Sequence, residues 1–459
     1  MNLYAKWASR TPGKQKKRLS PMQIIAIGFA LIILLGAILL NLPIASRNGE
    51  SVGFRSALFT ATSSTCVTGL VLFDTWTQWS GFGQVVILCL IEIGGLGFMS
   101  AASLFVFLLR RKVGMKQRML MAQALNVNDM EAIVRLQKWV LMGSLLIQLF
   151  GAVLLLLRFW PDYGFLTAAK WGVFHSVSAF CNAGFDIFGV ISPGNSLITF
   201  NNDPYVIVVI SMLVILGGLG FFVWEEVIRV HKWSKFSVYT KLVLLTSAVL
   251  LVGGGAIFCL LEWNNPASLG GMPVGQKLLN GFFQSVTCRT AGFVSLDQAG
   301  LTDAGKMFSC LLMLVGGSSG SVAGGAKTVT VLVLFLFLWT RLRGRSTVRV
   351  FKHTVMDNQV MDAMTIVMIM VSLMLFGGMF ISLTSPVGFV DGFYEATSAL
   401  ATVGNTAGAT AQLSVPSQLL VMVYMYFGRV GILTLSLGFL SGNRADDRYR
   451  YANTNLLIG

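Results

Sequence analysis

Charged side chains are scarce in this sequence. Only 12% of the 459 residues are Asp, Glu, Lys or Arg, whereas 55% are hydrophobic. Soluble domains carry about 25% charged residues, so the composition excludes a soluble protein. Apolar runs long enough to cross a hydrocarbon core of about 30 Å recur instead, and they predict spanning helices at 22–42, 85–109, 140–157, 206–224, 242–261, 308–339, 363–383 and 419–440. The first run is too long for a signal peptide and lacks a cleavage site of small residues, so we interpret it as a spanning helix.

Residues that form catalytic or metal sites are also few. The three histidines, at 175, 231 and 353, lie far apart, and Glu92 is the one acid deep inside an apolar run. A membrane-embedded enzyme needs paired acids, a histidine cluster or a nucleophile with its base, so the sequence disfavours this class, which is kept as a more distant alternative. We expect no bound cofactor. The six cysteines form no CxxC pair, which excludes a zinc site or a disulfide framework.

Basic residues are confined to particular loops. The net charge is +15, and 25 of the 34 Lys and Arg residues lie in five groups, at 1–20, 110–138, 229–241, 341–352 and 444–450. The alternate loops instead hold nine of the 19 Asp and Glu residues. This is the positive-inside pattern of a plasma-membrane protein with both termini in the cytoplasm. The excess positive charge is therefore topological and does not indicate a nucleic-acid partner.

One pattern occurs four times along the chain. An aromatic residue precedes a glycine by ten positions in each copy, at Phe59 and Gly69, Phe174 and Gly184, Phe282 and Gly292, and Tyr394 and Gly404. A second cluster rich in glycine follows 24 to 33 residues later, beginning at Gly94, Gly217, Gly316 and Gly428. These landmarks predict repeats at 21–110, 111–230, 231–341 and 342–443, between a basic N-terminus (1–20) and a C-terminal tail (444–459).

The segments that begin each hairpin are too short to span a bilayer. Phe54–Thr65, at about 1.5 Å per residue, must enter the membrane and return, and non-helical backbone is tolerated there only if it is buried or lines water. We therefore predict an all-α polytopic protein in which eight transmembrane helices and four pore helices surround one pore with pseudo-four-fold symmetry. Taken singly, the glycine pairs have an alternative role as helix-packing devices. The string GGLGF has no βαβ context and is not a dinucleotide loop.

The hairpin triplets contain no charged side chain, so any ion ligands there must be backbone atoms. An extended strand that ends in glycine can point successive carbonyls at the axis, and stacked carbonyl rings can replace the hydration shell of a monovalent cation. The short helices aim their negative C-terminal ends at the same centre. The predicted ion ligands are the backbone carbonyls of Val67, Thr68, Gly69, Asn182, Ala183, Gly184, Thr290, Ala291, Gly292, Thr402, Val403 and Gly404.

The triplets VTG, NAG, TAG and TVG on four unequal repeats resemble the Trk/Ktr/HKT family of potassium transporters, and the chain is most similar to the Ktr-type membrane subunit (KtrB/KtrD) over residues 20–459. In that family a glycine in all four hairpins goes with K⁺ preference, so Gly69 implies K⁺ as the transported ion. The resemblance further implies a homodimer and a separate cytoplasmic regulatory ring of the KtrA/KtrC type, on which ATP or ADP would bind. The K⁺-binding subunit of an ATP-driven pump shares the repeat plan and remains the alternative.

The second helix of the third repeat is interrupted by a run of glycine and serine, which disfavours a helix. We predict a mobile gate there, formed by Gly316, Gly317, Ser318, Ser319, Gly320, Ser321, Gly324 and Gly325 together with Lys327 and Arg429. Arg429 lies about mid-span, where an arginine marks a functional interior site. The alternatives are a packing face for the glycines, a guanidinium that reaches outward, and a solvated Lys327.

Other polar residues near the hairpins have supporting roles in this interpretation. Arg289 is expected to hold the third hairpin by bonding to backbone or to an acid. His175 and Glu395 follow the repeat aromatics and are expected to form capping or supporting bonds. Glu92 is a candidate partner for one of the buried cations.

Overall fold

The computed structural model describes residues 21–97 and 133–431 as helices joined by short loops. The predicted basic N-terminus, the C-terminal tail and most of the 110–138 basic group lie outside these residues. All structural statements below concern the described part of the chain.

Four helices are long and apolar enough to cross a membrane on their own. They are α1 (Pro21–Leu40), α7 (Ile133–Tyr163), α11 (Val238–Glu262) and α15 (Asp357–Thr384). Each is the first helix of a predicted repeat. Their mean hydropathy favours lipid over water on most faces, which makes the chain a helical membrane protein.

A short helix follows each of these four. They are α2 (Phe54–Thr65), α8 (Phe165–Phe180), α12 (Val274–Thr287) and α16 (Phe389–Leu400). The bounds of α2 are those predicted for 54–65, and its 12 residues extend about 18 Å. All four helices end four or five residues before a hairpin glycine, so their C-termini lead directly into the hairpins.

The second helix of each repeat is shorter than the sequence predicts. These helices are α4 (Gly81–Leu96), α9 (Pro204–Leu219), α13 (Asp303–Leu314) and α17 (Val415–Val430). The prediction of one continuous helix over 206–224 is wrong, because Gly220 has a φ of +94° and α10 (Phe221–Val230) leaves α9 at an angle of 96°. Gly97 and Gly431, with φ of +88° and +94°, end α4 and α17 in the same way. The ends of the predicted 85–109 and 419–440 runs lie outside the described residues.

The third repeat is interrupted differently. A non-helical loop, 315–327, separates α13 from α14 (Thr328–Leu342). The glycine and serine run was predicted to break the helix, and this is confirmed. One continuous helix over 308–339 is thereby excluded.

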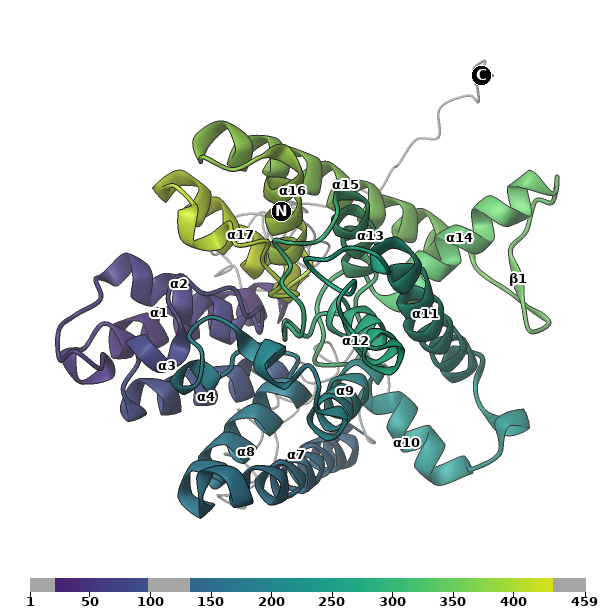
Figure 1. The fold of residues 1–459 in the computed structure, drawn as a ribbon. Helices are drawn as coiled ribbons and strands as arrows, with labels where there is room; N and C mark the ends of the chain where they lie inside the picture. Colours follow the sequence, from purple (N-terminus) through teal and green to yellow (C-terminus); the bar gives the residue numbers. More distant parts are fainter. Residues whose placement is uncertain (1–20, 98–132, 432–459) are drawn as a thin grey trace, which may run out of the picture.

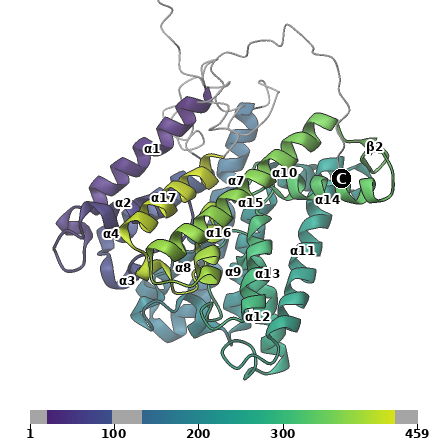
Figure 2. The same cartoon turned by 90° about the horizontal axis from the view of Figure 1, so that it is seen from above.

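Four groups of helices follow one another in chain order around a common centre (Figure 1). Shared apolar clusters join neighbouring groups: one contains Leu90 and Phe180, a second Phe59 and Tyr424, and a third Met313 and Tyr394. Figure 2 shows α8 and α12 toward one end of the molecule and α10 toward the other.

The remaining elements are short: α3 (Thr75–Gln78), the 3₁₀ turns η1 (Pro43–Ala45), η2 (Phe188–Val190), η3 (Ser196–Phe200), η4 (Trp233–Lys235) and η5 (Thr410–Gln412), and an antiparallel pair, β1 (Arg349–Val350) and β2 (His353–Thr354).

Candidate functional site

The four hairpin glycines form a closed ring at the centre of the molecule. A Cβ atom on Gly69 would lie 2.5 Å from the carbonyl oxygen of Ala183, and one on Gly184 would lie 2.8 Å from that of Ala291. A Cβ atom on Gly292 would lie 2.6 Å from the carbonyl oxygen of Val403, and one on Gly404 would overlap that of Thr68. Each triplet thus touches the next, and the fourth touches the first. We call these four triplets the hairpin ring.

The backbone of the ring repeats one unusual conformation. The first residue of each triplet has a positive φ, of 57° at Val67, 58° at Asn182, 70° at Thr290 and 52° at Thr402. The glycine two residues later also has a positive φ, whereas the residue between them has a negative φ. The prediction of an extended strand is therefore wrong, because left-handed residues alternate with a right-handed or extended one. Such residues cost about 1–3 kcal/mol each when they are not glycine, and this strain concentrates where function is expected.

Backbone N–H groups of the ring are bonded away from its centre. The amide of Thr68 donates to the carbonyl of Ser63 at 2.8 Å, and those of Ala183, Ala291 and Val403 donate to the ends of α8, α12 and α16. In the first and fourth hairpins the glycine amide donates to a serine hydroxyl, from Gly69 to Ser63 at 3.1 Å and from Gly404 to Ser398 at 3.0 Å. These bonds engage the middle amide of every triplet and, in two hairpins, the glycine amide as well. The carbonyl oxygens are the polar groups that the ring presents to its neighbours.

His175 and Glu395 hold the loops that leave the ring, as predicted. The imidazole Nε2 of His175 accepts from the amide of Ile187 at 3.2 Å, and its ring stacks on Phe188. Glu395 accepts from the hydroxyls of Thr406 and Thr410. Each side chain therefore bonds to the segment that follows its own hairpin, and supports it.

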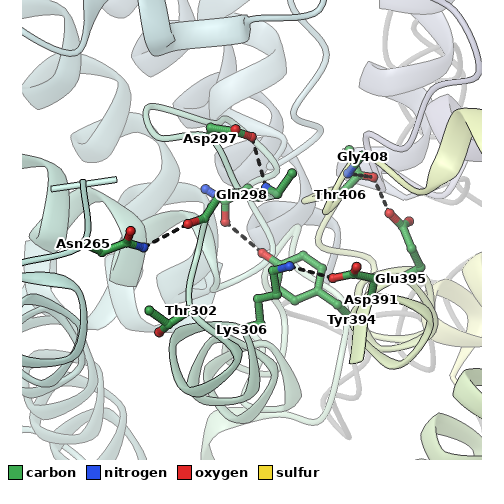
Figure 3. A network of polar contacts seen from close by, with 12 residues as sticks. Asn265, Asp297, Gln298, Thr302, Lys306, Asp391, Tyr394, Glu395, Thr406 and Gly408 are labelled. Atoms are coloured by element: carbon green, nitrogen blue, oxygen red, sulfur yellow. Dashed lines mark hydrogen bonds and ion pairs between the residues drawn. The ribbon is translucent and has the colours of Figure 1, made fainter. Parts of the chain in front are cut away.

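The third and fourth groups are joined by polar contacts outside the ring (Figure 3). The hydroxyl of Tyr394 donates to Gln298 at 2.8 Å, and Lys306 forms an ion pair with Asp391 at 2.7 Å. Buried side chains of this kind are stable only when they are fully bonded. These contacts fix the third and fourth outer loops with respect to each other.

Asp186 is a site residue that the sequence analysis did not single out. It lies two positions after Gly184, and its Oδ1 accepts from the amide of Phe188 at 3.1 Å. Burial, and secondarily the negative charge of Asp74, raise the pKa of Asp186 to about 7. The spacing of two residues from a hairpin glycine was the available signal. It places a partly buried carboxyl beside the second hairpin.

The second glycine clusters are packing positions in three repeats. A Cβ atom on Gly94, Gly217 or Gly428 would overlap the carbonyl oxygen of Thr65, Phe180 or Leu400, respectively. Those carbonyls lie at the ends of α2, α8 and α16. The packing role left open by the sequence is thus the one found here, since only glycine lets α4, α9 and α17 approach these helix ends.

The loop 315–327 lies against the end of α9 and against the fourth hairpin. The amide of Gly316 donates to the carbonyl of Ala326 at 2.8 Å and closes the loop at its base. The amide of Ser318 donates to the carbonyl of Gly218 at 3.0 Å, near the end of α9. A Cβ atom on Gly324 would overlap the Thr402 hydroxyl. The predicted gate residues from Gly316 to Gly325 are therefore together beside the hairpin ring.

Other bonds fix the tip of the same loop. The amide of Phe221, at the start of α10, donates to the carbonyl of Gly320 at 2.9 Å. The hydroxyl of Tyr239, on α11, donates to the carbonyl of Ser319 at 3.0 Å. The loop is therefore bonded to the elements on either side of the 231–237 connection.

Arg429 bonds to the loop and to the first repeat at once. Its guanidinium donates to the carbonyls of Val322 and Gly94, and to that of Gly95 at 2.8 Å. A guanidinium that reaches outward is excluded by these contacts. Lys327 is half-buried, and its Nζ donates to the carbonyl of Ala323 at 2.7 Å. Both predicted cations thus contact the loop.

Arg289 is buried next to the third hairpin and has no acidic partner among the described residues. Its guanidinium donates to the hydroxyls of Ser247 and Thr328, each at 3.3 Å. The Thr328 hydroxyl in turn donates to the carbonyl of Gly316 at 3.0 Å. The predicted partners, backbone or an acid, are wrong, because the Arg289 guanidinium bonds to two hydroxyl groups. Through Thr328 it links the third hairpin to the base of the loop.

Replacing Thr328 with valine is expected to lower the free energy of unfolding by about 1–3 kcal/mol, because the Gly316 carbonyl and the Arg289 guanidinium lose a buried partner. Thermal unfolding of the purified protein would measure the change. Thr340→Val is the matched control, since the Thr340 hydroxyl bonds only to the carbonyl of Leu336 in its own helix. Equal stability of the two variants would show that the buried link is unimportant.

Glu92 has partners other than a cation. Its Oε2 accepts from the amide of Gln148 at 3.0 Å and from the thiol of Cys181 at 3.4 Å. Glu92 was a candidate partner for a buried cation, and that prediction is wrong, because Glu92 forms no ion pair with any described Lys or Arg side chain. Glu92 instead joins α4 to α7 and to the second hairpin.

The cysteines at the hairpins are unreactive packing residues. Cys66, Cys181 and Cys288 are fully buried where their helices end, and all six cysteines of the chain are free. Among the described residues, no group of three or more His, Cys, Asp or Glu side chains could hold a metal ion. The polar groups at this centre are mainly backbone carbonyls and hydroxyls, with the Asn182 amide and the Arg289 guanidinium beside them.

Comparison with known proteins gives matches along nearly the whole chain. Residues 4–444 match the TrkH family model, described as cation transport protein. The potassium/sodium uptake protein NtpJ of Enterococcus hirae is 39% identical over 97% of this chain and 98% of its own length. Two Bacillus subtilis proteins also match, the Ktr system potassium uptake protein B (37% identical; 94% of this chain and 96% of its own) and protein D (32%; 97% and 99%).

Among solved structures, the potassium transporter TrkH from Vibrio parahaemolyticus superposes with a TM-score of 0.72 over 94% of this chain and 86% of its own length. The two sequences are only 16% identical, so this likeness shows a common fold.

Proposed function

This chain belongs to the TrkH family of cation transport proteins, which is not an enzyme family, and we propose that it is the ion-conducting subunit of a potassium uptake system. The observation that carries the proposal is the hairpin ring. Four triplets with one pattern of positive φ touch in a closed cycle, and the middle N–H of each donates to the short helix that precedes it. The carbonyls then supply the oxygen ligands that replace the hydration shell of K⁺.

Glycine at all four ring positions supports K⁺ as the preferred ion. The relatives differ in their printed substrates, since the Bacillus proteins are named for potassium and the Enterococcus protein for potassium and sodium. The ring here combines Val67, Asn182, Thr290 and Thr402 at equivalent positions, so it is chemically unequal around its cycle. We propose K⁺ selectivity that is real but lower than that of a ring of identical triplets.

The proposed architecture has eight spanning helices, four pore helices and repeats at 21–110, 111–230, 231–341 and 342–443. Four full-length apolar helices, each followed by a short helix and then by a shorter second helix, support it. The membrane potential draws K⁺ inward, at about 2.3 kcal/mol per charge per 100 mV.

The loop 315–327 and Arg429 form the proposed gate. The loop packs against the Thr402 side chain and is tied by Arg429 to the carbonyls of Gly94 and Gly95. In this arrangement the loop lies directly on the cytoplasmic side of the ring. A cation that leaves the ring then meets both the loop and a positive charge.

The proposal places both termini in the cytoplasm of a plasma-membrane protein, on the strength of the positive-inside pattern. We further propose a homodimer and a separate cytoplasmic ring of the KtrA/KtrC type that binds ATP or ADP. The support for this partner is the similarity to proteins named as parts of a Ktr system.

Expression of the chain in a strain that lacks its own potassium uptake systems is expected to restore growth at low K⁺. Co-expression of a candidate regulatory subunit should increase the rate further. Uptake of ⁸⁶Rb⁺ by the same cells measures transport directly. Absence of rescue by a protein that reaches the membrane, with and without the partner, would contradict the proposed function. Rescue that depended on a pump ATPase would favour the alternative of a pump subunit.

A further inference from the structure

A groove lies between α4 and α8. It has a volume of about 500 Å³, and its walls include Val85 and Leu88 from α4 and Val173 and Phe174 from α8. The two helices are neighbours (Figure 1). The lining residues of α4 run from Gly81 to Leu88, a length of about 10 Å along the helix. The groove therefore offers about 10 Å of wall along which part of an acyl chain can lie.

The groove opens sideways toward the surroundings of the protein. Val85 and Val173 are 59% and 48% exposed, although both are apolar. In a membrane protein such a face meets lipid. An occupant would thus keep part of its length in contact with the bilayer, which a water-soluble ligand would not do.

The rim of the same groove is basic. Arg47, Lys170 and Trp76 line it, and the Arg47 guanidinium lies 4.4 Å from the centre of the Trp76 ring. Arg158 and Lys306, on the same side of the membrane, are neutralised by ion pairs with aspartates. Arg47 and Lys170 form no ion pair with any described residue. The rim of the apolar groove therefore carries two basic side chains that no described acid neutralises. Trp76 lies beside them, and tryptophan is enriched at membrane–water interfaces.

We propose that this groove binds an anionic phospholipid of the outer leaflet. Its phosphate lies between Arg47 and Lys170, and one acyl chain extends along Val85 and Val173. Charge complementarity selects an anionic headgroup, since each basic residue near a membrane surface attracts such lipids. The apolar walls select a lipid over free phosphate. This site is independent of the hairpin ring and of the proposed transport.

Native mass spectrometry of the full-length protein, titrated with phosphatidylglycerol or phosphatidylcholine, tests the proposal. Arg47→Gln and Lys170→Gln are each expected to raise the Kd for phosphatidylglycerol about fivefold and to leave phosphatidylcholine unchanged. Arg55→Gln is the matched control, because Arg55 is exposed at the start of α2 and does not line the groove. Val173→Trp should abolish the same binding by filling the groove while every charge is kept.

Several results would overturn the proposal. Equal binding of the two lipids to the unmodified protein would remove the charge selection. Competition by glycerol phosphate as strong as that by the lipid would show a phosphate site without an acyl chain. If Val173→Trp disrupted a dimer and left phosphatidylglycerol binding intact, a second copy of the chain would be the occupant. Thermal unfolding of each variant separates loss of the site from loss of the fold.

Discussion

Gly69→Ser is expected to lower the ratio of K⁺ to Na⁺ uptake by at least about tenfold, which corresponds to about 1.4 kcal/mol of discrimination. Gly69 has a φ of +95°, and a Cβ atom there would lie 2.5 Å from the Ala183 carbonyl oxygen. The serine must therefore push the second hairpin away or rotate its own backbone. Either change moves carbonyls of the ring, so its fit to one ion size is lost. Competitive ⁸⁶Rb⁺ and ²²Na⁺ uptake measures the ratio.

Gly53→Ser is the matched control for this experiment. Gly53 has a φ of +82°, similar to that of Gly69, but no atom lies within 4 Å of its Cβ position. It therefore carries the same backbone strain, about 1–3 kcal/mol, without the collision. We expect its selectivity to equal that of the unmodified protein. Unchanged selectivity of Gly69→Ser, at normal expression, would refute the assignment of the ring as the selectivity filter.

Arg429→Ala is expected to raise K⁺ uptake about tenfold, which requires a barrier lower by about 1.4 kcal/mol. The substitution removes a positive charge and also frees the carbonyls of Val322, Gly94 and Gly95. The loop 315–327 then loses its bond to the first repeat. Deletion within 318–325 should also raise K⁺ uptake, because it shortens the loop that is proposed to block the pore. Initial rates of ⁸⁶Rb⁺ uptake at matched expression measure both.

Arg429→Lys separates the two causes. Lysine keeps the positive charge but lacks the planar guanidinium whose several N–H groups bond to the loop and to the first repeat at once. A rate near that of the unmodified protein would mean that the charge limits passage, whereas a rate near that of alanine would mean that the bonds to the loop do. If neither Arg429→Ala nor the shortened loop transported faster than the unmodified protein, the gate assignment would be lost.

Arg289 illustrates what the sequence predicts about a buried charge and what it leaves undetermined. The sequence predicts that a buried arginine beside a hairpin needs partners, because an unpaired charge is costly. It does not predict that these are the hydroxyls of Ser247 and Thr328, which lie 42 and 39 residues away. The prediction for Glu92 was wrong for the same reason, because its partners, Gln148 and Cys181, belong to the next repeat.

The sequence by itself determined the class of molecule, the four repeats, the short helices, the hairpin glycines and the interrupted helix of the third repeat. Those features are local, since apolar length, aromatic spacing and glycine content act within a few turns of chain. Only the tertiary structure decided that the triplets close into a ring with alternating φ, that α9 bends by 96° at Gly220, and which groups Arg429 bonds. These depend on contacts between repeats more than a hundred residues apart. No local pattern encodes them, because the strain of a positive φ at Val67 or Thr402 is stabilised only by the neighbouring hairpins.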